Sequence, residues 1–286
     1  MFFLTKLNPY RVLRRIPYFR SANQKRNMSQ LIKFKEDKKV AYITFNRADK
    51  YNSFVREMAL AVQEKLDYCE QNDEIRAVVI SGSGKAFCAG QDLKEAIDDN
   101  GIELKNIVAE HYNPVIKKLR SIEKPVIAAV NGVAAGAGAN IALNCDITVA
   151  AKSASFIQAF SKIGLIPDSG GTYILPRLVG MQKAAALMMT GDKVSAEEAE
   201  QMNMIYKCVA DEELQDEVAA LATKLAAMPT KALGLTKRLL NNGLNNSLEE
   251  QLEEERALQY EAGTSHDYKE GVNAFLEKRK PDFKGK

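Results

Sequence analysis

The chain has 286 residues, of which 46% are hydrophobic, so it is long enough to bury one large core or two modest ones. Its 40 basic and 37 acidic residues leave a net charge of +3, which gives no general attraction for nucleic acid. No apolar run approaches the roughly 20 residues of a membrane span, and the 4 cysteines are widely spaced, with no CxxC pair. We therefore expect a reduced, intracellular protein with no metal site, no nucleic-acid partner and no membrane partner.

The first 27 residues are basic and contain no acidic residue. Two interpretations remain open. The composition resembles an organelle transit peptide, which would direct the protein to mitochondria. Alternatively, translation begins at Met28, directly before strand-like sequence, and the protein is cytoplasmic. In either case residues 1–27 form an N-terminal extension that we leave outside the fold.

Strand and helix patterns alternate from Met28 to Ser195. A β-hairpin is predicted from residues 31–35 and 41–45, with its turn at 36–39. Helical spacing follows at 54–72, where one face collects Met58, Val62, Leu66 and Cys69. The other predicted elements are strands at 77–80, 126–130 and 147–150, a helical stretch at 106–122 and a helix from Ala137 to about Asn144. This order predicts an α/β domain with largely parallel strands.

From Ser195 onward the pattern is helical only. Ser195 and Glu198 fit a capping box, and helices are predicted at about 213–228 and 248–262, with a shorter one between. One face of the first helix carries Val218, Leu221, Leu225 and Met228. This stripe must be buried on its own core or on a neighbouring chain. We therefore divide the chain into an α/β core at 28–195 and a helical C-terminal region at 196–286.

Two turns rich in small residues, at 85–93 and 132–138, each follow a predicted strand and lead into a helix. Small residues allow a ligand to approach the backbone, and a helix start directs free N–H groups at it. Two such turns could share one anion, as in an oxyanion hole. A dinucleotide fingerprint is disfavoured because Ile141 replaces its third glycine. Gly82 to Lys85 lacks the spacing of a phosphate loop and is interpreted as a tight turn.

Asp168 is the only charged residue between Ile163 and Pro176. One interpretation makes it the N-cap of a helix that starts near Gly170. The other is a carboxylate in a partly apolar pocket, with a raised pKa suited to proton transfer. His111 is interpreted as structural and His266 as solvated, and no Gly-x-Ser-x-Gly elbow supports a hydrolase triad.

Three segments occur in order along the chain: Phe87-Cys88-Ala89-Gly90-Gln91-Asp92-Leu93, then residues 131–138, then residues 164–172. Together with residues 187–199 and the tail at 270–279, they resemble the crotonase (enoyl-CoA hydratase/isomerase) family from about Met28 to the C-terminus. The resemblance implies a spiral of ββα units and a helical C-terminal region that forms trimers, often as a dimer of trimers. It also implies an acyl-CoA substrate and no cofactor beyond the CoA that this substrate carries.

The same resemblance assigns candidate site residues. The N–H groups of Gln91 and Ala137 would stabilise the thioester oxygen as it becomes an enolate, although glycine is more usual than alanine at the second position. Phe275 and Lys278 of the tail would contact the adenine nucleotide. The other expected substrate- or CoA-binding residues are Ala89, Gly90, Asp92, Leu93, Lys94, Gly136 and Asn140.

Hydratases of this family use two glutamates, and the matching positions here hold Asn140 and Phe160. Neither side chain can exchange a proton at neutral pH, so we expect poor hydration. Asp168 stands where family isomerases carry a carboxylate, which favours an isomerase. The amino-acid sequence of the three segments most resembles that of family members that convert 2-(1,2-epoxy-1,2-dihydrophenyl)acetyl-CoA to oxepin-CoA in phenylacetate degradation. The alternatives are an enoyl-CoA isomerase or hydratase of fatty-acid β-oxidation, and a non-catalytic protein of this fold that binds CoA or RNA.

Overall fold

The computed structural model describes residues 31–98 and 101–286, so the extension expected at 1–27 lies outside the described residues. The strands are β1 (Ile32–Asp37), β2 (Val40–Phe45), β3 (Ala77–Gly82), β4 (Ala86–Cys88), β5 (Val126–Val130), β6 (Val133–Ala135), β7 (Ile147–Ala151), β8 (Ser155–Ile157), β9 (Lys193–Ser195) and β10 (Lys207–Val209). The α-helices are α2 (Arg56–Gln71), α3 (Leu93–Ala96), α4 (Leu104–Asn106), α5 (Asn113–Ser121), α6 (Ala137–Leu143), α7 (Gly171–Val179), α8 (Met181–Thr190), α9 (Ala196–Gln201), α10 (Leu214–Ala226), α11 (Thr230–Asn242), α12 (Leu248–Gly263) and α13 (His266–Leu276). Shorter turns of helix are the 3₁₀ segments η1 (Ala48–Lys50), η3 (Ala159–Ile163) and η4 (Asp211–Glu213) and the π-helical segment η2 (Ile107–Tyr112).

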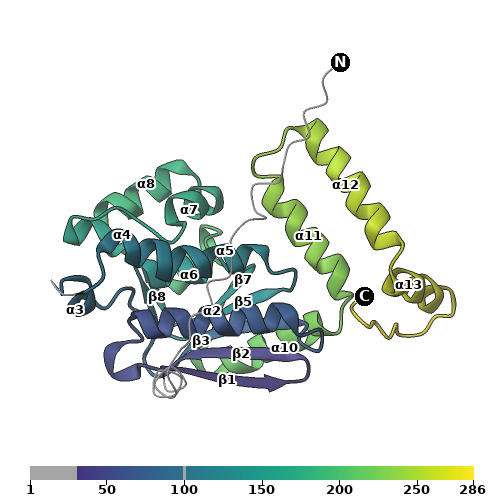
Figure 1. The fold of residues 1–286 in the computed structure, drawn as a ribbon, viewed down its shortest axis with the longest axis horizontal. Helices are drawn as coiled ribbons and strands as arrows, with labels where there is room; N and C mark the ends of the chain where they lie inside the picture. The colour runs from purple at the N-terminus through teal and green to yellow at the C-terminus, as the bar shows by residue number, and fades with distance from the viewer. Residues whose placement is uncertain (1–30, 99–100) are drawn as a thin grey trace.

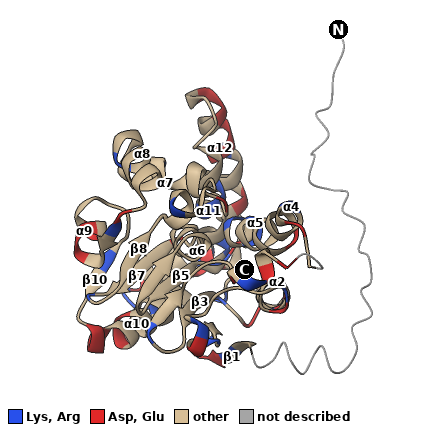
Figure 2. Cartoon of the chain, turned by 90° about the vertical axis from the view of Figure 1, so that its left-hand side faces the viewer, with Lys and Arg blue, Asp and Glu red and all other residues tan. Residues whose placement is uncertain are grey.

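The described strands form two sheets, one of 6 strands in the order β1-β2-β3-β5-β7-β10 and one of 4 strands in the order β4-β6-β8-β9. Only the pairs β1–β2 and β8–β9 are antiparallel, which confirms the expected α/β fold with largely parallel strands. The inner strands β3, β5 and β7 carry no charged side chain, as is usual for parallel strands covered on both faces (Figure 2). The hairpin turn is shorter than predicted, because Lys38 and Lys39, with φ of 50° and 65°, close it in two residues.

Helices cover both faces of the larger sheet (Figure 1). The predicted face of α2 is confirmed, since Met58, Val62, Leu66 and Cys69 are all fully buried. On the other side α10 packs against β3, β5 and β7 of its own chain, with Val218 and Ala222 buried. Of the apolar stripe predicted on this helix, Val218 is buried and Leu221 and Leu225 pack partly buried against the core of the same chain, whereas Met228 is 40% exposed. The capping box of Ser195 and Glu198 is confirmed.

Three details of the expected element pattern are corrected. The stretch at 106–122 is not one regular helix, because α4, η2 and α5 follow one another through a π-helical turn. The turn at 132–138 contains a short strand, β6, and the C-terminal part is not purely helical, because β10 pairs with the edge of β7. Strands of 3 residues give too little alternation to be recognised by periodicity.

The helices α11, α12 and α13 lie beside the α/β body as an arm (Figure 1). Gly234 allows α11 to lie close to the body, because a Cβ atom there would be 2.6 Å from the carbonyl oxygen of Glu123. One turn further along α11, the buried ammonium of Lys237 pairs with Asp146 at 2.8 Å, and Asp146 also accepts from the N–H of Val126, so α11 is tied to the start of β5. No helix among the described residues is long and apolar enough to cross a membrane.

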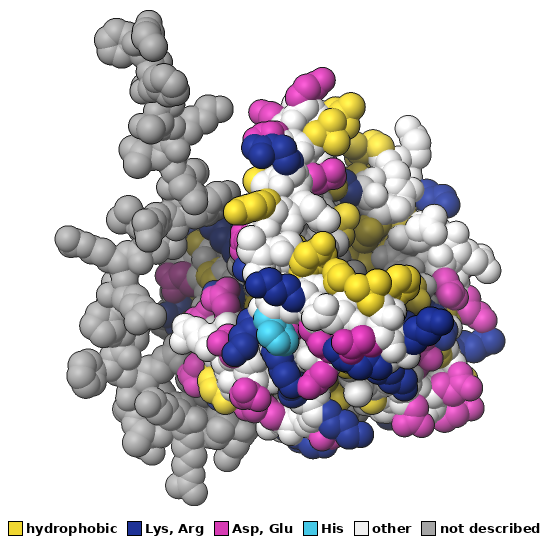
Figure 3. Space-filling view, turned by 90° about the vertical axis from the view of Figure 1, so that its right-hand side faces the viewer, with side chains coloured by type: hydrophobic (Ala, Val, Ile, Leu, Met, Phe, Trp, Pro, Cys, Tyr) yellow, Lys and Arg dark blue, Asp and Glu magenta, His cyan; other side chains and the backbone are white. Residues whose placement is uncertain are grey.

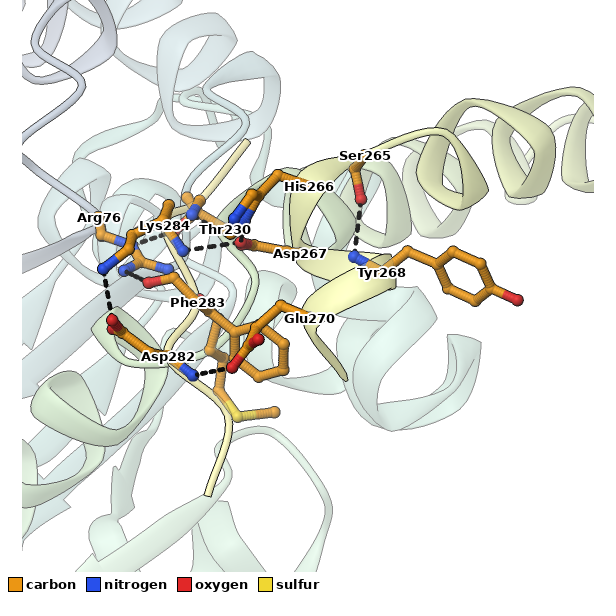
Figure 4. Close-up of polar contacts among 12 residues, drawn as sticks. Arg76, Thr230, Ser265, His266, Asp267, Tyr268, Glu270, Asp282, Phe283 and Lys284 are labelled. Atoms are coloured by element: carbon orange, nitrogen blue, oxygen red, sulfur yellow. Dashed lines mark hydrogen bonds and ion pairs between the residues drawn. The ribbon is translucent and has the colours of Figure 1, made fainter. Parts of the chain in front are cut away.

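The C-terminal segment after α13 is bonded back to the body (Figure 4). Arg76, at the start of β3, donates to Thr230 Oγ1 at 2.7 Å and to the carbonyl of Phe283 at 2.8 Å. The buried carboxylate of Asp267 accepts from the N–H groups of Lys284 and Gly285, each at 2.7 Å. These bonds fix the position of α13 relative to β3 and α11.

Candidate active site

A cavity of about 190 Å³ lies where the two glycine-rich turns meet the loop before α7. Its wall is almost entirely apolar, and Asp168 contributes the only charged side chain among the described lining residues. The lining residues are Ala89, Gly90, Gln91, Leu93, Ala96, Leu104, Ile107, Tyr112, Gly136, Ala137, Ala159, Phe160, Ile163, Leu165 and Asp168.

The two turns lie in direct contact at the base of this cavity. Gly90 has a φ of 90°, and a Cβ atom on it would lie 3.0 Å from the carbonyl oxygen of Ala135 and 3.5 Å from the nitrogen of Ala137. Gly138 is equally constrained, because its Cβ would be 2.2 Å from the carbonyl oxygen of Cys88. The first turn of α6 is thus pressed against the end of β4, and only glycine allows this approach.

Gln91 and Ala137 both belong to the cavity wall, as the sequence predicts. Within residues 31–98 and 101–286, neither backbone N–H has a protein acceptor. Ala137 is the first residue of α6, where backbone N–H groups have no partner within the helix. The arrangement can therefore donate two hydrogen bonds to one oxygen atom of a bound ligand.

Asp168 faces the same cavity from the loop before α7. Burial raises the pKa of its carboxyl above the ordinary value, while a hydrogen bond from the Ser169 hydroxyl at 2.8 Å opposes that rise. The interpretation of Asp168 as a helix N-cap is wrong, because Gly170 occupies that position and α7 has no side-chain cap. A carboxylate whose pKa is raised toward neutrality is suited to taking up and returning a proton.

Tyr112 is a cavity residue that the sequence analysis missed. Its ring stacks on Phe54 with centroids 5.7 Å apart, and its hydroxyl donates to Gln91 Oε1 at 2.9 Å. Gln91 Nε2 in turn donates to Glu95 at 2.7 Å. The turn that carries the backbone N–H of Gln91 is therefore held in place through the Gln91 side chain. The π-helical turn of η2 directs Tyr112 into the cavity, and π-turns are frequent at functional sites. Burial raises the pKa of Tyr112 well above its usual value, so the hydroxyl stays protonated and can donate.

The two positions matched to hydratase glutamates differ in their surroundings. Phe160 lines the cavity, where its ring would lie 3.7 Å from a Cβ atom at Gly136. Asn140 is fully buried beneath the wall and is not among the lining residues, so the structure does not place it where a substrate would contact it.

The two histidines lie outside the cavity wall. His111 is buried, which agrees with a structural role, and burial lowers its pKa. His266 is the first residue of α13, with its side chain 53% exposed and 3.1 Å from Asp267.

The remaining expected binding residues fall into two groups. Ala89, Gly90, Leu93 and Gly136 lie in the cavity wall. Asp92 instead pairs with Arg47 at 2.9 Å and caps α3 by accepting from the N–H of Lys94 at 3.1 Å, while the Lys94 side chain is exposed.

Phe275 lies in the last turn of α13 and Lys278 two residues after its end, both outside this cavity. Phe275 is 82% exposed and Lys278 is also exposed, so within one chain the structure does not bring either residue to the site. Among the described residues, no group of three or more His, Cys, Asp or Glu side chains could hold a metal ion.

The comparison with known families agrees with this geometry. Residues 35–286 match the family model described as enoyl-CoA hydratase/isomerase. The chain belongs to this family and is an enzyme of the acyl-CoA hydratase and isomerase type.

Individual relatives cover nearly the whole chain. It is 47% identical, over 91% of its length and 100% of the relative, to 1,2-epoxyphenylacetyl-CoA isomerase of Escherichia coli (strain K12). It is 33% identical, over 89% of its length and 98% of the relative, to trans-2-decenoyl-[acyl-carrier-protein] isomerase of Streptococcus mutans. The crystal structure of an enoyl-CoA hydratase from Polaromonas sp. JS666 superposes with a TM-score of 0.82 at 35% identity, covering 88% of this chain and 99% of that one. These relatives confirm the crotonase fold.

Proposed function

We propose that this enzyme is an isomerase that moves a proton within a bound acyl-CoA thioester, with Asp168 as the acid/base and the N–H groups of Gln91 and Ala137 as the oxyanion hole. The observation that supports this most is a single buried carboxylate, with a raised pKa, facing two N–H groups that have no protein acceptor in the described chain. Hydration would need a second acid/base group, and the apolar ring of Phe160 lines the wall instead.

The reaction follows from these roles. The thioester oxygen accepts from Gln91 and Ala137, which makes the hydrogens on the adjacent carbon more acidic. Asp168 removes one of these protons, and the resulting enolate oxygen is stabilised by the two N–H groups. The protonated Asp168 then returns the proton to a different carbon of the same acyl group. Substrate and product are isomers, so the reaction needs no oxidant, reductant or cofactor beyond the CoA of the substrate.

We propose a ring-epoxidised phenylacetyl-CoA as the substrate and its oxepin-CoA isomer as the product. In this reaction the C–C bond shared by the epoxide and the six-membered ring breaks, which expands the ring to seven members, and the proton that Asp168 takes from the carbon next to the thioester is returned to a ring carbon. The name of the E. coli relative supports this choice. So do the aromatic rings of Phe160 and Tyr112 and the apolar side chains of Leu104 and Ile107 in the wall. Such a surface favours a flat, apolar ring over a polar acyl group.

Turnover of the purified chain on a panel of acyl-CoA substrates tests this proposal. We expect the aromatic epoxide to be isomerised faster than aliphatic 3-enoyl-CoA substrates, and crotonyl-CoA to be hydrated negligibly. Faster conversion of the aliphatic substrates would replace the proposed substrate with those of β-oxidation. Rapid hydration of crotonyl-CoA would contradict the isomerase mechanism itself.

We also propose that the arm of α11, α12 and α13 assembles the chain into a trimer or a dimer of trimers. Figure 3 shows apolar side chains gathered on the face that these helices form. Exposed large apolar residues of the arm are Leu240, Leu244, Leu248, Leu252, Tyr260, Tyr268, Val272, Phe275 and Leu276. An apolar surface of this kind is usual where chains associate.

A further inference from the structure

Asn140 has two hydrogen-bond partners beneath the cavity wall. It lies on α6 and is fully buried. Its Nδ2 donates to the backbone carbonyl of Asp168 at 2.9 Å, and its Oδ1 accepts from Gln158 Nε2 at 2.8 Å. The amide of Gln158 therefore fixes the orientation in which Asn140 presents its N–H to the loop of Asp168.

Asn144, the C-cap residue directly after α6, repeats this contact at the next residue of the loop. Its Nδ2 donates to the carbonyl of Ser169 at 3.1 Å and to the carbonyl of Asn140 at 2.8 Å. Two successive carbonyls, those of Asp168 and Ser169, are thus held by one side chain of α6 and one of its C-cap residue.

The loop needs such support because its backbone is in an unfavourable conformation. Ser169 has a φ of 50° and the following Gly170 a φ of 70°. A residue with a side chain is disfavoured in this left-handed region, and the conformation persists only where surrounding contacts impose it. The hydrogen bonds from Asn140 and Asn144 are contacts of this kind.

The packing around Asn140 leaves room for this side chain and little more. A Cβ atom at Gly171 would lie 2.3 Å from Asn140 Nδ2, so the start of α7 presses directly on the amide. A glutamate at position 140 would be longer and, when ionised, would have no hydrogen to donate to the Asp168 carbonyl. Position 140 therefore requires a side chain that is both small and able to donate an N–H.

We propose that Asn140, assisted by Asn144, is a positioning residue for the isomerase reaction, which holds the carboxylate of Asp168 in the cavity by fixing its backbone. This inference rests on the proposed role of Asp168. Asn140 acts only through Asp168 and does not touch the substrate. Its removal displaces the acid/base while leaving the oxyanion hole and the binding of CoA intact.

A double-mutant cycle between Asn140→Leu and Asp168→Asn tests this inference. For Asn140→Leu alone we expect turnover to fall about 10²-fold with KM changed less than about threefold, because a misplacement of about 1 Å has effects of this size. In the double variant we expect no more than about threefold loss beyond Asp168→Asn alone. Asn140→Asp, which differs little in shape but loses the N–H donor when ionised, is run in the same cycle in case the leucine variant folds poorly.

Thr148→Val provides the matched control. Thr148 also donates from a buried side chain to a carbonyl of α6, that of Ala142 at 2.9 Å, but does not contact the loop of Asp168. We expect this variant to lose some thermal stability and keep its turnover. If the losses of Asn140→Leu and Asp168→Asn multiply, or if Thr148→Val lowers turnover as much as Asn140→Leu, the positioning role is wrong while the proposed function stands. Near-normal turnover of Asp168→Asn would overturn both.

Discussion

The cavity region and the arm of α11, α12 and α13 use apolar side chains in opposite ways. Around the cavity, Phe54, Phe87 and Ile107 are completely buried by their own chain. On the arm, Leu240, Phe275 and Leu276 are each at least 69% exposed. The proposed catalytic groups all lie on one chain, whereas the arm presents a surface that a single chain leaves uncovered. We infer that substitutions in the first region change turnover, and that substitutions in the second change assembly.

The largest effect is expected at Asp168, the charged residue among the described residues that line the cavity. Asp168→Asn should keep the fold and the affinity for acetyl-CoA but lower turnover by roughly 10²–10⁴-fold, the range for loss of a general acid/base. Steady-state kinetics and calorimetric titration with acetyl-CoA measure both quantities. A variant that instead loses affinity and keeps its turnover would place Asp168 in binding rather than in catalysis.

Deleting residues 264–286 tests the arm. We expect the oligomer to dissociate and acetyl-CoA to bind about tenfold more weakly, a difference of about 1.4 kcal/mol. The weaker binding follows from the family expectation that Phe275 and Lys278 contact the CoA of an assembled enzyme. Light scattering and titration measure the two effects.

A milder variant controls for damage to the chain itself, because the deletion also removes Asp267 and the segment that Arg76 contacts. Phe275→Ser combined with Leu276→Ser changes two exposed side chains and keeps these bonds. It should dissociate the oligomer while the secondary structure of the monomer is retained. A double variant that stays trimeric or hexameric would contradict assembly through this end of α13.

A smaller effect concerns stability and pH. Because burial raises the folded pKa of Asp168, the folded protein holds this proton more tightly than the unfolded chain does. Its stabilising contribution is complete below about pH 4, the ordinary range for an aspartate, and is lost as the pH rises through the raised value. Asp168→Asn should therefore raise the thermal midpoint at pH 7, and this gain should disappear toward pH 4. A variant equally destabilised at both pH values would contradict the buried position of the carboxylate.

The smallest effect is expected for the extension. A chain that begins at Met28 should match the full chain in thermal midpoint and specific activity, because residues 1–27 carry none of the periodic apolar pattern of the core. A large loss of either property would make this segment part of the folded domain.

The periodic spacing of apolar residues and the local composition predicted the main helices and strands well. The apolar run of β5 and the face of α2 that includes Met58 and Val62 lie where the sequence places them, because burial requires these regular spacings. The small residues of the two turns likewise predicted that the backbone of Gly90 approaches Ala137.

Features that depend on three-dimensional neighbours could not be predicted in this way. The burial of Asn140 beneath the cavity follows from the packing of Gly171, which is 31 residues away in the sequence numbering. The entry of Tyr112 into the cavity depends on a π-helical turn that helical periodicity does not reveal. The exposed face of the arm was not predicted, because the apolar stripe that the sequence shows lies on α10, which packs against the sheet of its own chain. An apolar stripe alone does not show whether the same chain or another chain covers it.

The central claim, proton transfer by Asp168 next to an oxyanion hole, is tested most directly by hydrogen exchange on a bound thioester. Phenylacetyl-CoA lacks the epoxide and cannot complete the reaction, but the carbon next to its thioester carries exchangeable hydrogens. In D₂O, we expect the wild-type enzyme to introduce deuterium at this carbon, detected by NMR, and Asp168→Asn to bind the compound with at least 10²-fold slower exchange. Equal exchange rates for the two proteins at saturating ligand would contradict the account.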